Sequence, residues 1–73
     1  MVNYEYNKDK MQLEVTGSIT DLLSAKDSYD HYFTSCRENM QGINTKDTVR
    51  YYGLLQKLRA EGETVTDWFI ENN

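Results

Sequence analysis

The chain has 73 residues, which is enough for one small domain with a single hydrophobic core. Twelve acidic residues against eight basic ones give a net charge of −4, which favours solubility and disfavours nucleic acid as a partner because phosphates are also negative. A single cysteine and a single histidine exclude an intrachain disulfide and a histidine–cysteine metal centre. With no long apolar run and no signal-peptide pattern, these features indicate a cytoplasmic protein without a membrane segment.

The N-terminal segment alternates apolar and polar residues, which is typical of strands with one buried face. A polar turn at residues 7–10 separates two such runs, so we expect a β-hairpin over residues 2–16. Two strands alone are marginally stable, and helices must therefore cover the apolar face. The apolar positions of the hairpin are Val2, Tyr4, Tyr6, Met11, Leu13 and Val15.

A first helix is predicted over residues 19–41. Ser18 and Asp21 resemble a capping box at its start, and Gly42 supplies a left-handed stop after its end. Apolar residues recur at helical spacing on one side, which predicts the face that packs on the core. This stripe consists of Leu22, Ala25, Tyr29, Tyr32, Phe33, Cys36 and Met40.

A second helix is predicted over residues 46–61, with a cap at Asn44 or Thr45 and Gly62 at its end. Gly53 within it lowers helix propensity or marks a close helix crossing. A further cap pattern predicts a short helix over residues 65–71. The stripe of the second helix is Tyr51, Tyr52, Leu55 and Leu58. The whole chain is therefore expected to form one α+β domain of order ββααα, with a two-stranded antiparallel hairpin packed on two antiparallel helices plus a short C-terminal helix.

No pattern typical of catalysis or metal binding is present. The best local ligand set, Asp27, Asp30 and His31, lacks the spacing of known zinc or calcium sites and is interpreted as a solvated ion pair. Cys36 lies in the apolar stripe, about 140° around the helix from His31, so the two cannot form a dyad within that helix. The glycines match no phosphate-binding loop. We predict a protein that is not an enzyme and has no cofactor.

Charge is divided between the outer faces of the two long helices. Lys46, Arg50 and Lys57 form a basic stripe on the second helix, whereas the first helix and the C-terminal residues are acidic. Tyrosine is enriched at protein interfaces, which makes Tyr52 a candidate anchor. The residues expected to contact a partner are Leu23, Asp27, Asp30, His31, Glu38, Lys46, Arg50, Tyr52, Lys57, Glu63, Asp67 and Glu71.

The leading hypothesis is a non-enzymatic protein–protein interaction module. Its partner is expected to be a second copy, which would give a homodimer, or a larger protein with a basic surface. Size, acidity and the missing catalytic groups suit a small inhibitor of a bacterial protein, of the kind that phages and mobile elements encode. The alternative hypothesis is an accessory protein that binds nucleic acid through the stripe of Lys46, Arg50 and Lys57.

Overall fold

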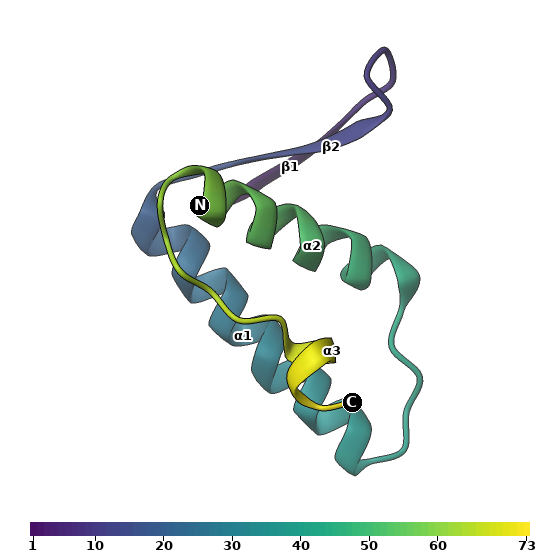
Figure 1. Ribbon diagram of the computed structural model, residues 1–73. Helices are drawn as coiled ribbons and strands as arrows, with labels where there is room; N and C mark the ends of the chain where they lie inside the picture. The colour runs from purple at the N-terminus through teal and green to yellow at the C-terminus, as the bar shows by residue number, and fades with distance from the viewer.

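The computed structural model describes residues 1–73 and confirms the predicted α+β fold of order ββααα. Strands β1 (Asn3–Asn7) and β2 (Gln12–Thr16) form the hairpin, and helices α1 (Ile19–Glu38), α2 (Thr45–Ala60) and α3 (Trp68–Glu71) follow. The two long helices run in roughly opposite directions, and α2 packs against both α1 and β2 (Figure 1). The hairpin lies over α2 with its tip projecting from the body, and α3 lies beside the C-terminal half of α1.

The hairpin has the predicted register but buries less of its apolar face than expected. Tyr4 pairs with Val15 and Tyr6 pairs with Leu13, as the shared parity requires. Tyr6 and Met11 were expected on the covered face, yet they are 54% and 78% exposed. Both lie toward the projecting tip, and Met11 belongs to the turn, where its φ of 52° is left-handed. The end of the hairpin therefore leaves large apolar side chains open to solvent.

Two of the predicted helix caps are confirmed by their hydrogen bonds. The Ser18 hydroxyl accepts from the backbone N–H of Asp21 at 3.2 Å, and the Asn44 side-chain oxygen accepts from that of Lys46 at 2.7 Å. Asn44, rather than Thr45, is thus the cap of α2. Gly62 follows the end of α2 with a φ of 90°, a conformation that favours glycine.

The predicted end of the first helix was wrong. α1 ends at Glu38, three residues earlier than expected, and Met40 rather than Gly42 takes the left-handed conformation, with a φ of 56°. The backbone N–H groups of Met40 and Gln41 donate to carbonyls of the last helical turn, which is the Schellman pattern. Met40 therefore leaves the apolar stripe and is 94% exposed.

Gly53 marks a close approach, but the neighbour is the hairpin and not another helix. A Cβ atom at this position would lie 2.9 Å from Cγ2 of Val15 and 3.2 Å from Cδ2 of Leu13. Any side chain here would push against the two residues that β2 lays on the helix. The absence of a side chain at Gly53 lets the hairpin rest directly on α2.

The third helix is shorter than predicted and begins at Trp68 instead of residue 65. The preceding residues are not helical, and side chains contact their carbonyl oxygens: Val65 accepts from Arg59 at 3.2 Å, and the Thr66 carbonyl lies 3.4 Å from the Tyr51 hydroxyl. A helical turn over these residues would point the carbonyls along its own axis. Asp67 is therefore the residue that caps α3.

The interior consists of an aliphatic cluster under the hairpin and an aromatic cluster between the helices. Val15, Leu22, Leu54 and Leu58 form the first; Phe33, Tyr51 and Leu55 form the second, with Trp68 and Phe69 packed against it. The hydroxyl of buried Tyr51 donates to Oδ1 of Asp30 at 2.7 Å and accepts from the backbone N–H of Trp68 at 3.0 Å. This hydroxyl therefore joins α1, α2 and the start of α3.

Buried Tyr51 and half-buried Tyr4 make the stability of the fold sensitive to alkaline pH. Burial raises the pKa of Tyr51, and it raises the pKa of Tyr4 from 10.0 to about 12. The folded protein thus keeps phenol protons that the unfolded chain releases, so stability present below pH 10 is lost as pH rises toward 12. We expect the urea midpoint to fall over this range and to fall less steeply in Tyr4→Phe. Parallel curves for the two proteins would contradict the assignment.

Candidate partner-binding surface

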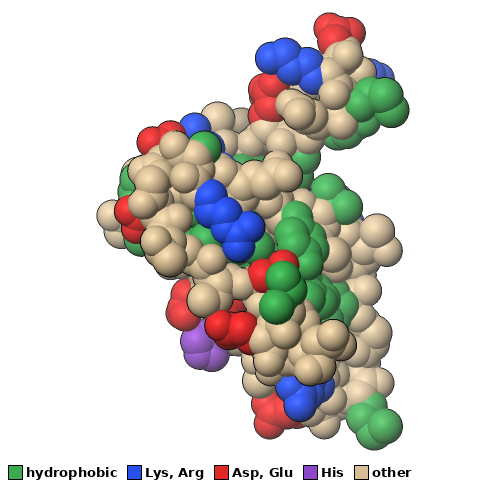
Figure 2. Space-filling model, viewed as in Figure 1, with side chains coloured by type: hydrophobic (Ala, Val, Ile, Leu, Met, Phe, Trp, Pro, Cys, Tyr) green, Lys and Arg blue, Asp and Glu red, His purple; other side chains and the backbone are tan.

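Large apolar side chains gather where the hairpin lies over α2. Four of the nine exposed large hydrophobic residues, Tyr6, Met11, Val49 and Tyr52, line two shallow hollows on this side of the molecule. Leu13 and Val49 line both hollows, which therefore form one continuous surface. We call this surface, with Lys46 and Arg50 at its edge, the hairpin groove. Figure 2 shows hydrophobic side chains on the projecting hairpin and across the middle of the face below it.

Helical spacing places the α2 wall of the hairpin groove. Val49, Gly53 and Gln56 follow one another at i, i+4 and i+7, and Tyr52 precedes Gln56 by one turn, so these residues share a face of the helix. The ring of Tyr52 stacks on Phe69, with centroids 5.9 Å apart and planes inclined by 22°. Because this stacking holds the ring in place, Tyr52 offers a fixed aromatic surface to a partner.

The predicted basic stripe is divided between two places. The Arg50 guanidinium lies over the ring of Tyr4, 5.0 Å from its centroid, and together with Lys46 it lines the hairpin groove. Lys57 is instead bound to Glu61, with Nζ 3.0 Å from Oε1. Only the first two cations are thus grouped at the candidate surface.

The outer face of α1 carries four of the predicted contact residues. Nδ1 of His31 lies 2.9 Å from the backbone oxygen and 3.6 Å from the carboxylate of Asp27, and these two groups raise the pKa of His31. Leu23 and Glu38 are also exposed on this helix. No large apolar side chain other than Leu23 accompanies them, so this face resembles an ordinary solvated surface.

Two acidic residues that were predicted to contact a partner make hydrogen bonds within the protein. The Asp30 carboxylate accepts from Nζ of Lys26 at 2.6 Å as well as from Tyr51. Asp67 is buried, and its Oδ1 accepts from the backbone N–H of Phe69 at 2.8 Å, which caps α3. The expected C-terminal acidic cluster therefore loses Asp67 from the surface. Of its remaining predicted members, Glu63 is half-buried and Glu71 is exposed.

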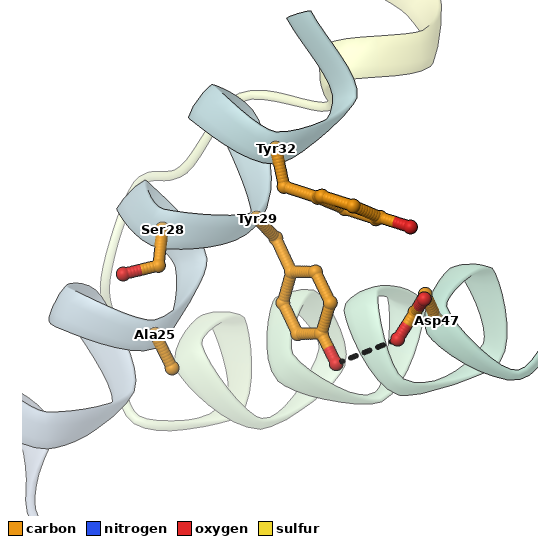
Figure 3. Close-up of a pocket in the computed structure, with 5 residues that line it drawn as sticks. All are labelled: Ala25, Ser28, Tyr29, Tyr32 and Asp47. Atoms are coloured by element: carbon orange, nitrogen blue, oxygen red, sulfur yellow. Dashed lines mark hydrogen bonds between the residues drawn. The ribbon is translucent and has the colours of Figure 1, made fainter. Parts of the chain in front are cut away.

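A further hollow of about 460 Å³ lies between α1 and the start of α2 (Figure 3), lined by Ala25, Ser28, Tyr29, Tyr32 and Asp47. The Tyr29 hydroxyl donates to Oδ1 of Asp47 at 3.4 Å, and burial together with this carboxylate raises the pKa of Tyr29. The Ser28 hydroxyl points away from Asp47. No nucleophile therefore meets a base here, and the hollow offers mainly apolar walls.

No group of three or more histidine, cysteine, aspartate or glutamate side chains is arranged to hold a metal ion, and Cys36 is a buried free thiol. None of the helices combines the length and the hydrophobicity that a membrane span needs. Neither a protein-family model, nor a curated protein, nor a solved structure matches the chain. The geometry of the hairpin groove is thus the main guide to function.

Sequence reasoning missed three of the residues that form the hairpin groove: Tyr6, Met11 and Val49. The first two were assigned to the buried face of the hairpin, and Val49 lay outside the apolar stripe that was assigned to the second helix. One signal was present, because Val49 and Gly53 are four residues apart and a glycine on a helix face admits a close neighbour.

Proposed function

We propose that this protein is a non-enzymatic protein-interaction module whose hairpin groove receives a segment of a larger partner. The observation that carries the proposal is the continuity of the exposed side chains of Tyr6, Met11, Val49 and Tyr52. Soluble monomers usually scatter such residues singly, whereas contiguous apolar patches mark interaction sites. Tyrosine and methionine are also enriched in protein interfaces.

A module of this size without catalytic groups acts by occupying a partner's surface, as a small inhibitor does. The buried free thiol of Cys36 suits the reducing cytoplasm, which is where we place the protein. The hairpin groove is shallow and open on one side, which suits an extended or helical segment better than an enclosed small molecule.

Val49→Asp tests the proposal, because it places a charge in the middle of the hairpin groove. Val49 is 51% exposed, so the substitution leaves the interior intact. We expect affinity capture from a lysate of the source cells to recover the partner with wild type but not with Val49→Asp. Binding to this variant should be weakened more than about tenfold, as at interface hot spots.

Leu23→Asp serves as the matched control, because it places the same charge at an exposed leucine of α1. This variant should capture the partner as well as wild type does. Thermal unfolding should show that both variants stay folded. Retention of the partner by Val49→Asp, or its loss in Leu23→Asp alone, would contradict the proposed surface.

A further inference from the structure

We infer that the segment bound in the hairpin groove is acidic and carries bulky apolar side chains. This inference depends on the proposed function and specifies the chemistry of the partner. It follows from three features of the groove: the charges around it, the nature of its floor, and the poor fit of a second copy or of nucleic acid.

Some of the lysine and arginine side chains have partners within the protein and others do not. Four of the eight lysine and arginine side chains have a hydrogen bond or an ion pair within the protein: Lys26 with Asp30, Arg37 with Asn72, Lys57 with Glu61 and Arg59 with the Val65 carbonyl. Of the other four, Lys8, Lys10 and Lys46 have neither, and the Arg50 guanidinium lies over the ring of Tyr4. Two of these lie in the hairpin turn and two lie on the edge of the groove.

The acids near these four cations neutralise them only in part. Asp9 lies in the same turn, and Asp47 lies beside Lys46 but faces Tyr29 and the hollow between the helices. Glu5 and Glu14 pair across the opposite face of the hairpin. Lys46 and Arg50 therefore give the edge of the groove a local positive charge in a protein whose net charge is −4, and this charge attracts and orients an acidic partner.

The floor of the groove requires apolar side chains from the partner. Leu13 and Val49 form its centre, and Gly53, against which Leu13 packs, also lines it. Aliphatic groups such as these gain from burial against other apolar groups. A polyanion without apolar side chains would gain nothing from this burial and would be repelled by the net negative charge of the protein.

A second copy of the chain is a poor occupant of the groove. A symmetric contact through the same surface would bring Lys46 and Arg50 of one copy into the same interface as those of its mate. Such like charges repel at close range, especially where apolar contact removes water. Charge complementarity thus favours an acidic segment of a different protein over self-association.

Selection from a displayed library of random peptides, about a dozen residues long, tests the inference on the full chain. Immobilised wild type is the target, and a counter-selection against the Val49→Asp variant removes peptides that bind outside the hairpin groove. We expect the enriched peptides to carry net negative charge and spaced bulky apolar residues. The affinity of one such peptide is then measured by fluorescence anisotropy for wild type, Lys46→Glu and Arg37→Glu.

Lys46→Glu reverses an uncommitted charge at the groove and should weaken binding about tenfold. Arg37→Glu makes the same change near the far end of α1 and should leave binding unchanged. Peptides that require Val49 but show no acidic bias, or bind Lys46→Glu normally, would overturn the inference and leave the proposed function standing. Tighter binding of a single-stranded DNA oligonucleotide than of the selected peptides would also overturn it. Absence of any peptide that requires Val49 would overturn both.

Discussion

Phe33→Ala is expected to lower the free energy of unfolding by about 3 to 5 kcal/mol, the usual cost of removing a buried phenylalanine ring. The ring of Phe33 is fully buried, and its centroid lies 5.0 Å from that of Tyr51 and 4.9 Å from that of Phe69. Tyr29 and Trp68 also pack on it, each at 5.6 Å. A domain of this size has a total stability of about 4 to 11 kcal/mol, so the variant should lose a large part of it.

Urea denaturation followed by the fluorescence of Trp68 measures this loss, because the indole packs against the ring that is removed. Tyr32→Ala is the matched control, since it removes the neighbouring ring on α1, which is 42% exposed. That change should cost about 1 kcal/mol or less. Equal losses in the two variants would show that Phe33 is not the centre of the aromatic cluster.

Tyr51→Phe is expected to lower the free energy of unfolding by about 1 to 3 kcal/mol without leaving a cavity. The missing hydroxyl deprives Asp30 of its 2.7 Å hydrogen bond and leaves the backbone N–H of Trp68 without an acceptor. Asp30 keeps its ion pair with Lys26, which limits the effect on α1. The C-terminal segment should therefore loosen more than the pair of long helices.

Hydrogen exchange gives the readout that separates this local effect from a general loss of stability. The amide of Trp68 should exchange faster in Tyr51→Phe, and by a larger factor than the amides in the middle of α1. Tyr6→Phe removes a hydroxyl from an exposed tyrosine and should leave both stability and exchange unchanged. An undisturbed Trp68 amide in Tyr51→Phe would exclude the proposed role of the hydroxyl.

Local signals in the sequence were sufficient for the order of the elements. Alternation gave the hairpin, and side-chain caps at Ser18 and Asn44 gave the starts of the two long helices, because each cap acts within three residues of itself. The end of α1 was missed because the left-handed residue there is Met40, and backbone hydrogen bonds rather than residue type fix it. The start of α3 was missed because it depends on contacts with α2: Arg59 donates to the Val65 carbonyl, and the Tyr51 hydroxyl accepts from the backbone N–H of Trp68.

The candidate site was less predictable than the fold because a sequence displays charges without their partners. Asp30 and Asp67 looked like surface acids, yet one bonds to Tyr51 and the other caps a buried turn. Tyr6 and Met11 matched the parity of a covered face, but their exposure depends on how far α2 extends beneath the hairpin. Such facts arise only when elements are placed in space.

The contact at Gly53 also bears on how rigidly the two walls of the hairpin groove are held. Since β2 rests on bare helix backbone there, the two walls of the hairpin groove are held at one separation before anything binds. Recognition then requires little rearrangement of the receptor, and the conformational entropy lost on binding falls mainly on the incoming segment. Under the proposed function, the hairpin groove is thus a preformed receptacle for a segment that orders upon docking.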